Sequence, residues 1–165
     1  MVSLGTGDSL EAIEKLVDPA CAWAEIAYEH TSPEHLYFVA LYTAALLYID
    51  DLGSKHLDAV EQFAARFTRG EKQLSPALDV LVDLLQDAHR LYTKVGADAI
   101  IAGTLDAVTA MYIEYTTQKM EIKAHATLFP YYLRRRTAIC PPYIHCIFMK
   151  SWRGPSTDSY LQMMP

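Results

Sequence analysis

The chain has 165 residues, enough for one domain with a substantial buried core. Hydrophobic residues make up 52% and charged residues 21%, which lies on the apolar side of the range for soluble helical proteins. The formal net charge of −6, without a basic stripe carrying interleaved aromatic residues, argues against a general nucleic-acid binder.

Cysteine content and hydropathy indicate the cellular setting. The three cysteines, Cys21, Cys140 and Cys146, form no paired metal spacing and are an odd number for disulfides, so a reduced cytoplasmic setting is expected. The longest apolar run without a charge, residues 35–49, has about 15 residues against the roughly 20 that a membrane span needs. The first five residues lack the basic start and apolar block of a signal peptide. We therefore expect neither a membrane span nor a signal peptide.

The spacing of apolar residues predicts helices throughout the chain and no strand. The first helix is expected over residues 8–16, begun by Asp8 with Glu11 in the capping-box position. Asp18 and Pro19 are expected to interrupt it, so that a second helix covers residues 19–30.

The third predicted helix, residues 33–52, is the centre of the pattern. No residue from 35 to 49 is charged, so most faces of this helix must be covered by protein. Thr31 and Ser32 can cap its start, and the proline at its first position suits the first turn. Gly53 is placed to stop it.

Three further helices are expected before the character of the sequence changes. One covers residues 55–69 and is stopped by Gly70, and the next begins at Ser75-Pro76 and continues up to Gly96. The third, residues 97–122, is apolar on most of its surface and is therefore expected to be central to a bundle.

The last part of the chain is basic, aromatic and rich in proline. A helix is expected to start at residues 129–137, and the consecutive prolines of residues 140–143 are expected to break it. A short apolar piece over 143–149, a turn over 150–155 and a final helix over 156–164 complete the prediction.

Asp50 and Asp51 end the apolar third helix. The helix dipole already places partial negative charge there, so two carboxylates are expected to face something positive. One interpretation is Mg²⁺, which takes oxygen ligands from one or two carboxylates, from water and from a substrate phosphate. The other interpretations are a Lys or Arg cluster, or simply the point where a buried helix surfaces; on the pair alone, the last is favoured.

Arg134, Arg135 and Arg136 form a second candidate feature. Successive residues of a helix are ~100° apart, so at most one or two of the three can face a pocket. A bidentate clamp on phosphate oxygens is one interpretation. A solvated basic helix start is the other, and the run by itself favours it.

Aromatic residues on the two central helices form a third feature, and plain core packing explains most of them. If a pocket lies between these helices, each aromatic face could stabilise a carbocation by roughly 0.5–2 kcal/mol. The residues are Tyr37, Phe38, Tyr42 and Tyr48 on one helix, and Tyr112 and Tyr115 on the other.

Taken together, these segments resemble the class I terpene synthases of fungi, in particular the trichodiene synthase-like sesquiterpene cyclases. The resemblance covers the chain from about Ala22 to its end. It rests on residues 42–51 with their closing aspartates, on 105–115, on 129–135 and on 148–150.

The resemblance implies an all-α, class I terpenoid synthase-like helical bundle that binds Mg²⁺ and a polyprenyl diphosphate such as farnesyl diphosphate. Asp50 and Asp51 occupy the first two positions of a D-D-x-x-D-type metal motif, and Arg134 occupies the position that contacts the diphosphate. Tyr42 and Tyr112 are expected to contact the substrate, and no separate catalytic residue is assigned.

An active member of this family would be a carbon–oxygen lyase acting on phosphates. It would ionise farnesyl diphosphate with Mg²⁺, cyclise the cation to a sesquiterpene and release diphosphate.

The sequence departs from the family pattern in two places. Ser54 stands where the aspartate motif has its last acidic position, and the second metal motif, N-D-x-x-S-x-x-K-E, is not among these residues. By the family's layout it should follow Pro165, so residues 1–165 are expected to be a single partial domain lacking those C-terminal helices. The two central helices would then lack partners, and an exposed apolar groove with self-association is expected.

Two other interpretations stay open. One is a non-catalytic truncated relative that acts as a binding or interaction module. The other is an unrelated helical regulatory protein, which leaves the pairing of Asp50 with Arg134 unexplained.

Overall fold

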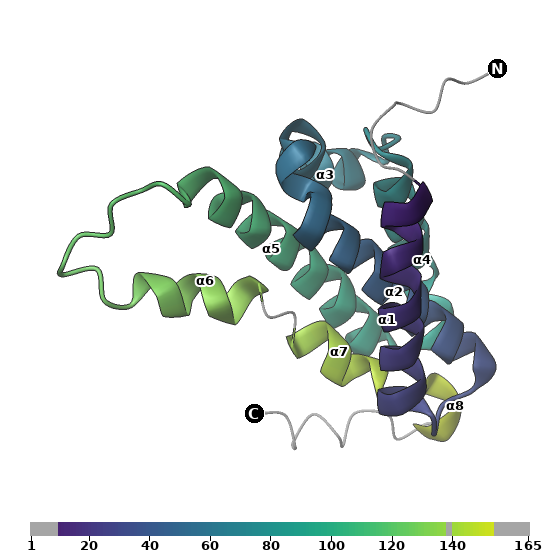
Figure 1. Cartoon of the computed structure of the whole chain (residues 1–165). Coiled ribbons are helices and arrows are strands. Elements are labelled where there is room, and N and C mark those ends of the chain that lie inside the picture. The colour runs from purple at the N-terminus through teal and green to yellow at the C-terminus, as the bar shows by residue number, and fades with distance from the viewer. Residues whose placement is uncertain (1–9, 138–139, 154–165) are drawn as a thin grey trace.

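A computed structural model describes residues 10–137 and 140–153 (Figure 1). In these residues the chain forms helices and no β-strand, and Tyr92 and Met149 form an isolated bridge, which confirms the expected all-α fold. The helices are α1 (Leu10–Tyr28), α2 (Pro33–Leu52), η1 (Gly53–Lys55), α3 (Leu57–Arg69), α4 (Pro76–Leu91), α5 (Lys94–Thr117), α6 (Phe129–Thr137), α7 (Cys140–Cys146) and α8 (Lys150–Arg153).

Helices α2 and α5 organise the bundle, as their apolar surfaces predict. Helix α2 packs against α1 and α4, while α5 packs against α3, α4, α6 and α7. Figure 1 shows α6 running back along α5, with the connecting loop at the side of the molecule away from α1 and α4. The two central helices, together with α6 and α7, also line the cavity described below.

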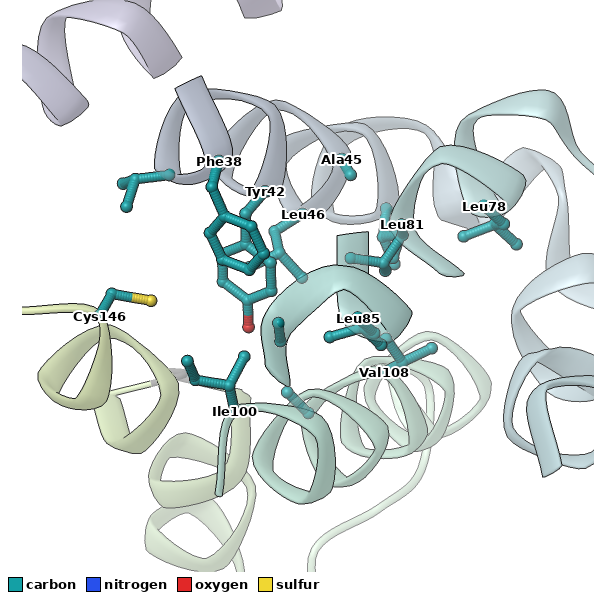
Figure 2. Close-up of a cluster of buried hydrophobic side chains, with 14 of the residues drawn as sticks. Phe38, Tyr42, Ala45, Leu46, Leu78, Leu81, Leu85, Ile100, Val108 and Cys146 are labelled. Carbon is teal, nitrogen blue, oxygen red and sulfur yellow. The ribbon is translucent and has the colours of Figure 1, made fainter. Parts of the chain in front are cut away.

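The core lies where α2, α4 and α5 meet (Figure 2). Phe38 and Tyr42 of α2 stack with ring centroids 6.0 Å apart, and Leu81 and Leu85 of α4 are completely buried beside them. Ile100 of α5 closes this cluster. Burying each such side chain contributes about 1.5–3 kcal/mol, so this junction is the main source of stability.

Among the described residues, two segments have the length and composition of a membrane span, although none was expected from the longest charge-free run. They are Pro33–Lys55 and Lys94–Thr117. Within the fold, 50% and 44% of their most apolar windows are buried by protein. The central helices of a helical bundle meet the same criterion.

The interruption predicted at Pro19 is wrong, because α1 continues through this residue. Proline has no N–H to donate inside a helix, but Pro19 lies on the exposed face, where water can bind the carbonyl of the preceding turn. The opposite face packs on α2 through residues four apart in sequence, which holds the helix together across the proline. These residues are Leu16, Ala20, Ala24 and Tyr28.

The boundary predicted at Gly96 is also wrong. Helix α4 ends at Leu91, and α5 begins at Lys94, two residues before the glycine. The cause is a side-chain cap: the hydroxyl oxygen of Thr93 accepts a hydrogen bond from the Gly96 N–H at 3.1 Å. At its other end α5 stops at Thr117, five residues earlier than expected.

Gly53 does not end α2 in the predicted way. Its φ of −59° is helical, and the chain continues into η1. A glycine suits this position because a Cβ would lie 3.0 Å from Cε2 of Tyr115 on α5, closer than ordinary van der Waals contact. Gly70, by contrast, ends α3 with a φ of 65°, in the left-handed region that favours glycine.

At the start of α2, Ser32 occupies the cap position without capping the backbone. Its side chain makes no hydrogen bond to an N–H of the first turn. Instead the Ser32 hydroxyl lies 2.7 Å from Nδ1 of His35. Thr31 also acts elsewhere, because its hydroxyl donates to the Tyr28 carbonyl at 2.7 Å.

Helix α6 occupies the residues predicted for it, whereas the proline pair does not prevent a helix. Pro141 and Pro142 fall in the first turn of α7, where a missing N–H is tolerated. A Cβ on Gly103 would lie only 2.7 Å from Cγ of Pro142, so α7 packs directly on the α5 backbone. Residues 150–153 form a short helix instead of a turn, and the helix predicted over 156–164 lies outside the described residues.

Candidate functional site

A cavity of about 740 Å³ lies between α2, α5, α6 and α7. Its apolar lining consists of Leu46, Leu47, Met111, Met120, Ile122, Phe129, Pro130 and Leu133. Its polar lining consists of Thr43, Asp50, Glu114, Thr117, Gln118, Arg134, Thr137 and Tyr143. The cavity therefore combines a hydrophobic surface with carboxylates and a guanidinium group.

Asp50 and Arg134, which the sequence analysis paired, border this same cavity. Partial burial raises the pKa of the Asp50 carboxyl, and the neighbouring Asp51 charge raises it further. The positive charge of Arg134 lowers the pKa of Asp50 and so opposes the effects of burial and of the Asp51 charge. The two residues, 84 positions apart in the printed sequence, are thus electrostatically coupled.

Asp51 has a different environment from Asp50. Both residues are exposed, but Asp51, unlike Asp50, is not among the residues that line the cavity. Successive residues of a helix project about 100° apart, which separates two adjacent carboxylates at the end of α2. As the structure stands, one of the two predicted metal ligands faces the cavity.

Tyr115 of α5 fixes the end of α2. Its hydroxyl donates to the main-chain carbonyl oxygens of Ile49 and Asp50, the latter at 2.8 Å. The Ile49 carbonyl also accepts a hydrogen bond from the Gly53 N–H, so the Tyr115 hydroxyl is an additional donor to the last turn of α2. Burial raises the pKa of Tyr115 to about 12, with further contributions from the negative charges of Asp50, Glu114 and Asp51.

The three arginines of α6 point in three directions, as helical spacing requires. Arg134 lies on the face that lines the cavity, together with Pro130, Leu133 and Thr137 at spacings of three, four and seven residues. Arg135 is exposed. Arg136 lies on a third face, where its Nε is 2.9 and 3.0 Å from the two carboxylate oxygens of Asp106 on α5.

The structure does not bring Tyr42 or Tyr112 to the cavity. Tyr42 is completely buried in the core, and its hydroxyl lies 2.7 Å from that of Thr104 (Figure 2). Tyr112 donates a hydrogen bond to the Glu61 carboxylate at 2.9 Å near the surface. Their predicted contact with a substrate therefore has no support from their positions.

Two lining residues were missed by the sequence analysis. Glu114 offers a second carboxylate, and the available signal was a lone acidic residue in the otherwise apolar stretch 107–115. Tyr143 offers an aromatic face, and its hydroxyl lies 2.8 Å from that of Thr43. No sequence signal connects Thr43 with Tyr143, because the two residues are 100 positions apart.

The donor set of the cavity suits one kind of metal site. Within residues 10–137 and 140–153, no three His, Cys, Asp or Glu side chains gather closely enough to hold a metal ion by themselves. Mg²⁺ usually binds through one or two carboxylates and completes its coordination with water and phosphate oxygens. The Asp50 carboxylate, whose charge is disfavoured beside Asp51, fits a site in which water and phosphate oxygens complete the coordination of the metal. It does not fit a site in which every metal ligand comes from the protein.

Comparison with known proteins identifies distant relatives. No protein-family model matches the sequence. The chain is 24% identical over 132 residues to alpha-cuprenene synthase COP6 of Coprinopsis cinerea, a match that covers 80% of this chain and 40% of the relative. It is 26% identical over 129 residues to terpene synthase BipA of Cochliobolus sativus, covering 77% of this chain and 39% of the relative.

The chain is therefore a distant homologue of fungal terpene synthases and spans about two fifths of the length of the relatives it matches. Its all-α fold agrees with part of a terpene synthase-like helical bundle. The narrower assignment to the trichodiene synthase-like group stays a prediction.

Proposed function

We propose that this chain forms the part of a terpene synthase that binds the diphosphate end of a prenyl diphosphate together with Mg²⁺, farnesyl diphosphate being the expected substrate. The observation that carries the proposal is the placement of Asp50 and Arg134 on one cavity whose remaining lining is apolar in about half of its residues. The volume of about 740 Å³ lies within the range of ligand pockets.

Each part of the cavity suits one part of such an amphiphilic ligand. The guanidinium of Arg134 matches diphosphate oxygens with paired N–H donors. The carboxylates of Asp50 and Glu114 would hold the cation on the opposite side of the diphosphate. Leu46, Met111 and the other apolar residues would cover the prenyl chain.

The proposed reaction begins with ionisation of the allylic C–O bond. Bound Mg²⁺ supplies Lewis-acid stabilisation of the departing diphosphate. Arg134 would add hydrogen bonds that strengthen as charge develops on the leaving oxygen. The apolar lining would exclude water from the carbocation, and Tyr143 offers an aromatic face there, in place of Tyr42 and Tyr112.

The test is incubation with farnesyl diphosphate and MgCl₂, followed by gas chromatography of an organic extract. We expect a hydrocarbon product that disappears in Asp50→Asn and Arg134→Gln. Asp83→Asn and Arg69→Gln change exposed residues of the same types away from the cavity and should keep the product. Product formation that survives Asp50→Asn would contradict the assignment of this site.

A second candidate is a non-catalytic relative that binds the ligand without converting it. Among the described residues, Asp50 and Glu114 are the acidic side chains that line the cavity, and two carboxylates can bind Mg²⁺ with a diphosphate whether or not the ligand is converted. Calorimetric titration with Mg²⁺ and inorganic diphosphate distinguishes the two. Binding without any extractable product favours the non-catalytic relative.

We also propose that the chain self-associates through apolar side chains near the loop between α5 and α6. Leu128 and Tyr131 are 75% and 69% exposed there. Sedimentation at several concentrations tests this, with Leu128→Ser expected to reduce association and Ile26→Ser of α1 as the control. A monomer at every concentration would argue against the proposal.

A further inference from the structure

Helix α6 carries Arg134, yet apolar burial does little to hold this helix in place. None of its residues is buried. Leu133 and Phe129 are partly buried, and they line the cavity. Since apolar burial normally decides where an amphipathic helix packs, something else must determine the position of α6.

A polar contact joins α6 to α5 on the side away from the cavity. Arg136 presents Nε and Nη2 to the Asp106 carboxylate, with Nε at 2.9 and 3.0 Å from its two oxygens. The Arg136 side chain is 22% exposed and that of Asp106 49% exposed, so water reaches the pair from one side. Two parallel N–H···O bonds restrict both distance and angle, unlike a simple contact between point charges.

Tyr132 extends this contact within α6. It lies one turn before Arg136, the guanidinium carbon is 5.1 Å from the ring centroid, and its hydroxyl is hydrogen-bonded to Nη1. The ring of Phe129 stacks on Tyr132 with centroids 6.4 Å apart. Arg136 is thereby oriented from its own helix as well as from Asp106.

We propose that Asp106 and Arg136 are positioning residues, whose contact holds α6 against α5 and thereby keeps Arg134 on the cavity opposite Asp50. The two arginines are two residues apart on a rigid helix and project about 200° apart. Fixing the face that carries Arg136 therefore also fixes the face that carries Arg134. The role in substrate binding rests on the proposed function, whereas the positioning of Arg134 does not.

Direct ligation by Asp106 or Arg136 would be a different role, and the cavity argues against it. Neither residue is among those that line it. The donors of Arg136 are directed to Asp106 and Tyr132. A ligand would have to break these contacts before it could use Arg136.

The test measures the pKa of Asp50 in the ligand-free protein by carboxyl ¹³C NMR, because Arg134 lowers that pKa when it lies at the cavity. The charge of Asp51, which also acts on Asp50, is unchanged in every variant. Arg134→Gln removes the guanidinium, and the rise in the Asp50 pKa in this variant is the reference value. Asp106→Asn should raise the pKa of Asp50 by at least half of that rise.

The sign of the change separates positioning from a simple charge effect. Removing the negative charge of Asp106 would by itself lower the pKa of Asp50, so a rise reports movement of Arg134. Arg136→Lys keeps the net charge while losing the paired donors, and it should raise the pKa as well. Amide exchange in residues 129–137 should become about fivefold faster or more in both variants.

Asp98→Asn is the matched control, because Asp98 is a half-exposed carboxylate on α5 that pairs with Lys94. It should change neither the Asp50 pKa nor the exchange of α6. An unchanged or lowered Asp50 pKa in Asp106→Asn, or no response even to Arg134→Gln, would overturn the proposal. Because no ligand is present, a failure to bind Mg²⁺ and diphosphate would count against the proposed function and leave this test intact.

Discussion

The Tyr115 hydroxyl lies 2.8 Å from the main-chain carbonyl oxygen of Asp50, so that α5 directly supports the residue that borders the cavity. Tyr115→Phe removes this hydrogen bond and the one to the Ile49 carbonyl, which keeps the Gly53 N–H as a donor. We expect a loss of about 0.5–1.5 kcal/mol in the free energy of unfolding, measured by urea denaturation. Tyr112→Phe, whose hydroxyl bonds Glu61 at the surface, should cost less. Equal losses in the two variants would show that the contact of Tyr115 with the end of α2 has no special weight.

Asp50 is expected to reduce stability at neutral pH. Its pKa is raised in the folded chain, so folding favours the protonated carboxyl. The stabilising contribution of that form is present below the unfolded-state pKa and is lost as the pH rises through the folded-state pKa. Asp50→Asn, which stays neutral, should therefore unfold at a higher urea concentration than the parent protein at neutral pH.

Under acidic conditions the parent carboxyl is itself protonated, and the difference between the two proteins should vanish. Asp51→Asn also removes part of the repulsion on Asp50 and should give a smaller gain at neutral pH. A destabilised Asp50→Asn protein at neutral pH would mean that the carboxylate has a favourable partner in the folded chain. The prediction implies that the proposed ligand site is maintained at a cost in stability.

Gly103→Ala should destabilise the protein by about 1–3 kcal/mol, although alanine is the better helix former. The added Cβ would lie 2.7 Å from Cγ and 2.8 Å from Cδ of Pro142, and both belong to a ring that cannot rotate away. Thermal or urea unfolding measures the loss. The double variant Gly103→Ala with Pro142→Ala should recover part of it, because the ring is then absent. A stabilised Gly103→Ala protein would show that α7 moves aside freely.

Stability should fall steeply in alkaline solution. Burial raises the pKa of the Cys146 thiol from an ordinary 9.0 to about 12 and that of Tyr143 from 10.0 to about 12. Above about pH 9 the unfolded chain loses the thiol proton while the folded chain keeps it. The free energy of unfolding should then decrease by up to about 1.4 kcal/mol per pH unit, with Tyr143 adding to the slope above pH 10.

Urea denaturation at several pH values checks this slope, and Cys146→Ala provides the control. That variant should be less stable near neutral pH, because it leaves space in the core, but its stability should decline less between about pH 9 and pH 10. An unchanged slope would show that the thiol is not the group responsible.

The sequence predicted those features that depend on a single element. Helix α2 and its closing aspartates follow from an apolar run with a defined end, and α6 follows from a change to basic and aromatic residues. The errors occur where tertiary contacts override a local preference. Pro19 remains inside α1 because the opposite face packs on α2, and Gly53 lies in close contact with Tyr115 from another helix.

The cavity could be predicted only in part for the same reason. Asp50 and Arg134 belong to recognisable segments, so their pairing was available from the resemblance. Tyr143 reaches the cavity because α7 packs on Gly103, a contact between residues about 40 positions apart that no local pattern encodes. The rings of Tyr42 and Tyr143 contact each other, and only packing decides that Tyr143 is the one that lines the cavity.

The different surroundings of Arg134, Arg135 and Arg136 imply three different tolerances to substitution within one short run. Replacing Arg134 should weaken anion binding and leave the helix where it is. Replacing Arg136 should let the helix shift and so move the Arg134 guanidinium away from Asp50. Replacing Arg135 should be nearly silent, since its side chain is exposed. A saturation-mutagenesis scan of these three codons would therefore give three distinct profiles, although the residues are chemically identical and adjacent.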